Sequence, residues 1–380
     1  MVARGSARCR ISGAPTTEGP ISIETEGDAG RPDVGAGSAP GHDGSSVPHL
    51  ADGVELMGPY EGSGFKDPPS LVRRADGQVV QLTKLLYVVA ETIDGQRDYD
   101  AIAQRVTEAF GRGVSADNVR VIVQEKLAPL GIVAGPDGSQ PALQKVDPLL
   151  ALKFRVSIIG EHHAQRIASL FKPLFWPPVV AVALGALVAF DAWLFLGHGV
   201  AQSFRDALYN PALILLVLGL VVVSAGWHEF GHAAGCAYGG ARPGAMGAGI
   251  YLAYPAFYTD VTDSYRLGRG GRLRTDLAGV YFNGLFVLVT AGLYAVTRFE
   301  PLLLVILVQH LEVAHQLLPF LRLDGYYIVA DLTGVPDMFA RIKPIFSSML
   351  PWREAEPAVI ELKPWARAVV TVWVLSLIHI

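Results

Sequence analysis

The chain has 380 residues, of which 51% are hydrophobic and 17% are charged. This composition is too apolar for an ordinary soluble protein of this length and favours a membrane protein. The formal net charge of -4 provides no strong positive field, so we expect no nucleic-acid partner. The two cysteines, Cys9 and Cys236, are too few for a disulfide scaffold or a four-cysteine zinc site.

The polar N-terminal part of the chain divides at about residue 65. Residues 1–65 are rich in Gly, Pro, Ser, Asp and Thr and predict a disordered N-terminal tail. Residues 66–146 have a globular pattern, with helices expected at 82–93, 99–110 and 116–130. The apolar stretches 78–80 and 132–134 are expected to pair as a ribbon. We therefore predict a small winged-helix α/β domain.

The order of these helices and the Asp94-Gly95 turn resemble the PqqD-like winged-helix domains, which hold precursor peptides for modifying enzymes. The resemblance covers residues 66–146 and implies that this part binds a peptide. A generic helical domain that only packs or dimerises is the alternative interpretation. The resemblance identifies no binding residues.

Long apolar runs follow, at 176–197, 211–237, 277–296 and 302–321, and a fifth begins near Ala368. The first four reach the roughly 20 residues that a helix needs to cross a bilayer. We predict an all-α polytopic membrane domain over residues 147–380, with at least four transmembrane helices. The fifth run meets Ile380 before it reaches that length, so we expect a C-terminally truncated domain whose final residues 376–380 are not native.

Every second loop is rich in basic residues, and this alternation predicts the orientation of the chain in the membrane. Lys and Arg gather at 153–172, at 242–274 and at 322–343, whereas the two opposite loops carry only Arg205 and Arg298. Cytoplasmic loops carry the excess of Lys and Arg. We therefore expect a multi-pass integral membrane protein with a cytoplasmic N-terminus. The chain opens with no signal-peptide pattern.

The second apolar run contains His228-Glu229-Phe230-Gly231-His232. Residues four apart lie on one face of a helix, so both imidazoles can reach one metal ion, with Glu229 beside them as a base. Ionisable residues at membrane depth are costly unless they are paired or coordinated. The sequence therefore predicts a metal site here, although two histidines that are satisfied by hydrogen bonds in a bundle would leave the same pattern.

A catalytic zinc takes three protein ligands, so one ligand is expected from elsewhere in the chain. Asp324 follows the fourth apolar run, after Pro319 and before Gly325. The second and fourth runs cross in the same direction, which places His228, His232 and Asp324 at a similar depth. Proline ends a helix and glycine permits a close backbone approach, so this segment can bring a carboxylate to the ion.

These motifs, with the hydrophobic topology, resemble the site-2 protease family of intramembrane metalloproteases over about residues 147–345. The runs 258–263 (YTDVTD) and 324–327 (DGYY) are similar to its bacterial branch of peptide zinc metalloproteases. The resemblance implies Zn2+ held by His228, His232 and Asp324, with Glu229 as the catalytic residue. It also implies a location in the bacterial inner (cell) membrane.

Two amides are candidate substrate-binding residues by the same resemblance. Gln316 stands where the family often has Asn, and Asn283 falls where the family has a further Asn. The change to Gln316 keeps an amide but puts its role in doubt. For Asn283, a packing role among small residues is an equal alternative.

The sequence thus predicts a membrane-embedded zinc metalloendopeptidase that hydrolyses peptide bonds of a peptide or membrane-anchored protein substrate, within the lipid bilayer. Partner subunits of a peptide maturation or export system are possible partners. The alternative is a non-catalytic membrane component of peptide maturation, export or immunity that binds a peptide. A di-iron oxidase, suggested by the further pairs His162-His163 and His310/His315, conflicts with the total of 10 histidines and the spacing.

Overall fold

The computed structural model describes residues 2–3, 47–135, 139, 152–199, 205, 210–350 and 356–378. The chain forms two compact units. The larger unit contains residues 1–8, 53–84 and 143–380, and the smaller unit contains residues 9–52 and 85–142. Most of the predicted tail and the end of the predicted peptide-binding domain lie outside the described residues.

The smaller unit is built from three short helices, α1 (Lys84–Thr92), α2 (Tyr99–Phe110) and α3 (Ala116–Val121), the last continued by the π-helical turn η1 (Ile122–Leu127). The Asp98 and Ser115 side chains cap α2 and α3 by accepting hydrogen bonds from Ala101 N and Asn118 N. Gly111 ends α2 in the left-handed conformation, with φ of 66°. The three predicted helices are therefore present, and Asp98 and Ser115 cap the starts of the second and third.

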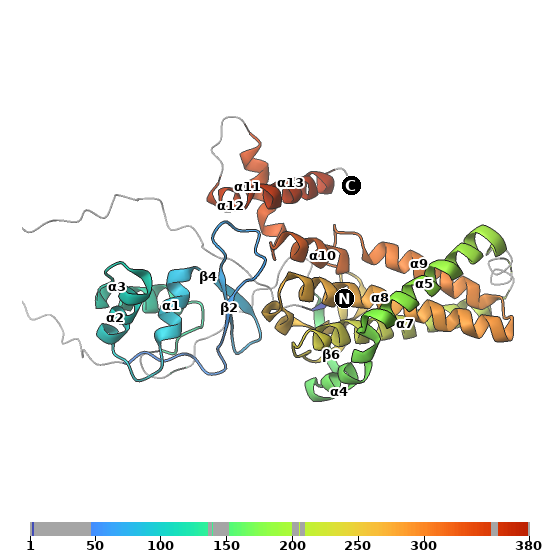
Figure 1. Cartoon of the computed structure of the whole chain (residues 1–380), viewed down its shortest axis with the longest axis horizontal. Helices are drawn as coiled ribbons and strands as arrows, with labels where there is room; N and C mark the ends of the chain where they lie inside the picture. The colour runs from blue at the N-terminus through green and yellow to red at the C-terminus, as the bar shows by residue number, and fades with distance from the viewer. Residues whose placement is uncertain are drawn as a thin grey trace, which may run out of the picture. The chain divides into compact units, whose positions relative to one another are not determined.

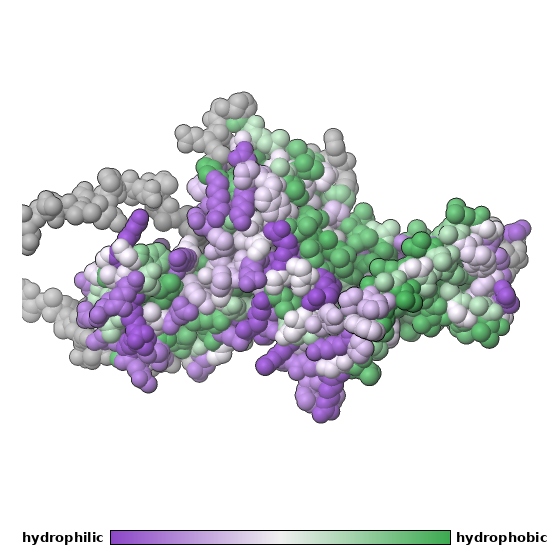
Figure 2. All heavy atoms as spheres, in the orientation of Figure 1, coloured by the Kyte–Doolittle hydropathy of each residue, from purple (hydrophilic) through white to green (hydrophobic). Residues whose placement is uncertain are grey.

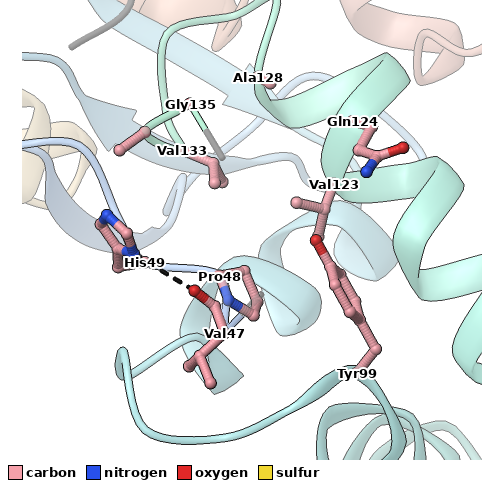
Figure 3. Close-up of a pocket in the computed structure, with 10 residues that line it drawn as sticks. Val47, Pro48, His49, Tyr99, Val123, Gln124, Ala128, Val133 and Gly135 are labelled. Carbon is pink, nitrogen blue, oxygen red and sulfur yellow. Dashed lines mark hydrogen bonds between the residues drawn. The ribbon is translucent and has the colours of Figure 1, made fainter. Parts of the chain in front are cut away.

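The ribbon predicted between 78–80 and 132–134 is wrong. Val133 pairs instead with Leu50, and Ala51 N donates to Ile132 O at 2.9 Å. Figure 3 shows a pocket of about 40 Å³ beside this pairing, lined by residues that include His49, Tyr99 and Gln124. The pocket has room for little more than ordered water. The segment 47–51 was assigned to the tail because its only pairing partners lie more than 80 residues downstream.

A three-stranded antiparallel sheet lies within residues 53–84 of the larger unit. It consists of β2 (Glu55–Pro59), β3 (Ser70–Arg73) and β4 (Val79–Leu82), in that order. Tyr60 and Phe65, which follow β2, are buried. The ordered chain therefore begins before the predicted boundary at residue 65, because these two aromatic side chains pack on distant residues that local composition cannot reveal.

Within the residues that the structure describes, three helices are long and apolar enough to span a membrane: α5 (Pro177–Ala192) with its continuation η3 (Trp193–His198), α7 (Pro211–Tyr238) and α8 (Arg269–Thr297). The fourth predicted span, 302–321, is shorter than expected, because α9 (Pro301–Gln316) ends at residue 316. Pro319 cannot continue the helix. After a turn the chain begins α10 (Asp324–Thr333), and the last apolar run forms α13 (Pro364–Ile378).

The long helices lie side by side, with α8 between α7, α5 and α9 (Figure 1). The short helix α4 (Glu161–Phe171) packs on α7. Large apolar side chains of α5, α7 and α8 face outward, among them Val188, Leu215 and Val289. Hydrophobic surface accordingly dominates this part of the molecule in Figure 2.

A second sheet adjoins α7 and was not predicted from the sequence. Its strands are ordered β1 (Val2–Ala3), β7 (Tyr254–Asp260), β6 (Met246–Tyr251) and β5 (Lys153–Ile159). The β6 and β7 strands form an antiparallel hairpin. The hydroxyl of Thr259, in β7, donates to Glu229 O at 3.0 Å. The hairpin is thereby fixed to the turn of α7 that carries the predicted motif.

Candidate metal centre

Helix α7 presents both predicted histidines to the interior of the larger unit. His228 and His232 lie about 40° apart around the helix axis, since each residue turns the helix by about 100°. Both side chains are buried, and so is Glu229 between them, at 3% exposure. The helix therefore carries two imidazoles and a carboxyl group on one side, away from solvent.

Small residues let helix α8 approach this face closely. A Cβ on Gly235 of α7 would lie 2.6 Å from the Cβ of Ala278, and one on Gly231 would overlap the Ala278 carbonyl. Opposite the motif stands Gly279 of α8, where a Cβ would overlap the imidazoles of both His228 and His232. The space that these rings occupy exists because residue 279 has no side chain.

Asp324 reaches the histidines from the first turn of α10. The turn between α9 and α10 is tight, since a Cβ on Gly325 would overlap the Leu317 backbone. The Tyr251 hydroxyl, from β6, accepts a hydrogen bond from Arg322 N at 3.0 Å. Burial raises the pKa of Tyr251 to about 12, so this hydroxyl is neutral at physiological pH. Strand β6 thus helps to fix the segment that delivers Asp324.

The three predicted ligands meet in one place. Asp324 Oδ2 lies 2.9 Å from His228 Nε2 and 3.4 Å from His232 Nε2, and the two Nε2 atoms are 2.9 Å apart. Among the described residues, this is the one group of three or more His, Cys, Asp or Glu side chains whose ligand atoms all lie within 4.8 Å of one another. All three side chains are buried.

The hydrogen bonding of His232 indicates which kind of ligand the three side chains fit. Its Nδ1 lies 2.8 Å from Thr275 O, and a carbonyl can only accept, so Nδ1 carries the proton. The Nε2 of the neutral ring then presents a lone pair to the other two ligand atoms. Without a proton between them, acceptor atoms this close repel unless they share a metal cation. Two imidazoles and a carboxylate form a ligand set that zinc and related metals take, so the residues fit a metal ion.

A buried ion pair holds the other end of α10. Asp331 lies seven residues after Asp324, on the same face of that helix, and accepts from Arg272 Nε of α8 at 3.0 Å. Arg272 is fully buried, donates to Glu61 O at 2.9 Å and lies over the Tyr60 ring at 4.3 Å. The Tyr60 hydroxyl donates to Asp331 at 3.3 Å. Helix α10 is therefore tied both to α8 and to the segment that follows β2.

The two predicted substrate-binding amides contact each other. Asn283 Nδ2 donates to Gln316 Oε1 at 3.1 Å, which joins α8 to the end of α9. Asn283 is buried and stands one helical turn beyond Gly279. The contact places this amide pair next to the helical turn that borders the histidines. It also gives the buried Asn283 amide a hydrogen-bond partner, as a residue with a packing role would need.

The other histidine pairs do not join the site. His310 Nε2 lies 3.2 Å from Asp191 Oδ1 of α5, and the His162 and His163 rings lie against each other. Neither pair belongs to a metal-binding group within the described residues. This arrangement gives no support to a di-iron centre.

Sequence reasoning missed Gly279, Thr275, Arg272 and Asp331. The Ala278-Gly279 pair of small residues was a visible signal for close helix packing. Thr275 acts through its backbone carbonyl, which no side-chain pattern reveals. Arg272 was interpreted only as a loop charge, because its partners are distant in sequence.

Comparisons with protein-family models, with curated proteins and with solved structures found no match to this chain.

Replacing Gly279 by Ala should abolish metal binding, since the new methyl group would occupy the position of the two imidazoles. The Gly292→Ala variant is the matched control, because the same helix leaves nothing within 4 Å of a Cβ there. Metal per chain, measured by elemental mass spectrometry on both purified variants, checks this. A Gly279→Ala protein with the wild-type metal content would contradict the geometry.

Replacing Asp331 by Asn should destabilise the fold by about 3–5 kcal/mol, because it leaves the Arg272 charge buried without its partner. The same substitution at the exposed pair of Arg120 and Asp117 should cost less than about 1 kcal/mol. Thermal unfolding of the full chain in detergent compares the two variants. Equal midpoints would show that the buried pair does not anchor α10.

Proposed function

We propose that the chain is a membrane-embedded zinc metallopeptidase that hydrolyses peptide bonds of a peptide or membrane-anchored protein. The observation that carries the proposal is the convergence of His228, His232 and Asp324 from two helices, with Glu229 buried in the same turn of α7. A purely structural metal site has no need of a carboxyl group between two of its ligands. A hydrolytic site requires one as a base.

The membrane location rests on three helices of sufficient length and apolarity and on their outward-facing apolar side chains. Such a surface is too large and too continuous for a soluble monomer. The basic residues before α5 and at the start of α8 favour a cytoplasmic N-terminus, and a bacterial inner membrane is part of the proposal.

Zinc is the metal that we propose, because two imidazoles and one carboxylate, those of His228, His232 and Asp324, are a ligand set that would hold a catalytic zinc. Its Lewis acidity polarises a carbonyl group and acidifies water near neutral pH. The residues around the ligands have two separate roles. Glu229 accepts the proton of the attacking water and returns it to the leaving amine, while Thr275 O keeps the His232 ring in the tautomer that can bind metal.

The N-terminal segment is proposed to present the substrate as a winged-helix peptide-binding domain. Its three described helices, α1 to α3, belong to the smaller unit, and the strands β2 to β4 belong to the larger unit. Asn283, in the middle of α8, and Gln316, at the end of α9, are proposed to act on the substrate beside the histidines. Partner subunits of a peptide maturation or export system belong to the same proposal.

Substituting Gln for Glu229 should remove hydrolysis and leave zinc in place, since the ligands are untouched and only the base is lost. The purified chain in liposomes would be incubated with a bacterial membrane-protein extract, and new protein N-termini would be identified by mass spectrometry. We expect new N-termini with the wild type and none with Glu229→Gln of equal zinc content.

Removal of zinc by a chelator provides the control, and activity should return when zinc is added back. Identical N-termini from wild type and Glu229→Gln would contradict the proposed peptidase. A zinc-loaded wild type that cleaves nothing and still binds peptides would favour the non-catalytic alternative.

A further inference from the structure

A long apolar cavity lies between α5 and α8, on the side of α8 that faces away from the metal ligands. Its volume is about 670 Å³. Most of the lining is aliphatic and comes from Val180, Leu184, Leu187, Leu277, Gly284 and Leu288. Gly284 helps to keep the cavity open, since a Cβ there would lie only 3.1 Å from Leu187 Cδ2.

The shape of the cavity limits what can occupy it. The lining extends along α8 from Gly270 to Leu288, which corresponds to about 27 Å at 1.5 Å per residue. The cavity is thus elongated along the helix axis and lined almost wholly by apolar side chains. An extended hydrocarbon chain suits such a lining.

One charged residue, Arg274, lines the cavity, near the end where the basic residues of α8 gather. Its guanidinium lies 5.0 Å from the centre of the Tyr238 ring, and its Nε is 3.5 Å from Gly235 O. No carboxylate of the described residues forms an ion pair with it. The Tyr281 hydroxyl, also in the lining, already donates to Leu174 O at 2.9 Å. Arg274 is thus the cationic group that a ligand in the cavity would meet.

We infer that this cavity binds one acyl chain of an anionic phospholipid, whose headgroup phosphate pairs with Arg274. The inference rests on the membrane location that is part of the proposed function. An elongated apolar cavity with a cation in its lining matches the two parts of such a lipid. Basic pockets between transmembrane helices on the cytoplasmic side are suited to acidic headgroups.

The position of the cavity connects lipid binding to the metal centre. Ala278 lines the cavity and packs against Gly235 of α7, and the next residue, Gly279, adjoins both imidazoles. A lipid chain in the cavity would press on the outer side of the α8 turn whose inner side borders the metal ligands. Lipid binding is therefore expected to stabilise the metal centre without contacting it.

The inference is tested by native mass spectrometry of the full chain, titrated in detergent with dioleoyl phosphatidylglycerol or with dioleoyl phosphatidylcholine. We expect one phosphatidylglycerol molecule to bind in preference to phosphatidylcholine. Arg274→Gln should lower the affinity for phosphatidylglycerol about fivefold or more and remove the preference. Arg298→Gln is the matched control, since Arg298 lies over a tyrosine ring at the other end of the same helix. It should leave binding unchanged.

A second variant, Gly284→Phe, fills the cavity and should weaken binding of both lipids, whatever their headgroup. Equal binding of the two lipids by the wild type, or unchanged binding by Arg274→Gln, would overturn the inference, and so would a peptide retained in the cavity. Zinc content measured on the same samples separates the two proposals. Lipid binding without zinc would contradict only the peptidase, and zinc without selective lipid binding would contradict only the lipid site.

Discussion

The close approach of α7 and α8 is the constraint on which the rest of the structure depends. Gly231, Gly235 and Gly279 remove the side chains that would separate the two helices. Only at this separation can Thr275 O reach His232 Nδ1 and leave room for two imidazoles. Packing between helices made of small residues is driven by van der Waals contact and does not need a hydrophobic effect, so it remains effective in a lipid environment. The grouping of His228 and His232 as candidate metal ligands is a consequence of this packing.

The third ligand depends on a different kind of interaction. Asp324 stands at the start of a short helix, and two contacts fix that helix: the Tyr251 hydroxyl before it and the Arg272–Asp331 pair two turns later. Because Arg272 also holds Glu61 O, the chain that follows β2 contributes to the same anchor. The sheet of the N-terminal segment is therefore joined mechanically to the helix that delivers a metal ligand.

Much of the site could be predicted because its signals are local. The His228–His232 spacing and the Asp324-Gly325 pair each lie within a few residues, and their meeting followed from the direction of the helices. The Arg272–Asp331 pair depends on a contact between distant segments, so no local pattern revealed it. Gly279 belongs to a visible pair of small residues, but its position beside the imidazoles depends on a second helix. The tail was predicted too long because the buried aromatic residues Tyr60 and Phe65 have partners far along the chain, among them Asp331 and Leu362. The fourth apolar run was predicted too long because hydropathy continues through Leu317 and Leu318, although the helix has ended.

The most direct test of the account is the metal content of the purified chain, compared with His228→Ala and Asp324→Ala on the same preparation. Elemental mass spectrometry should find about one zinc per wild-type chain. Both variants should lose it, because each removes one of only three protein ligands. Zinc that persists in Asp324→Ala would contradict the three-ligand centre, and iron in place of zinc would contradict the proposed chemistry.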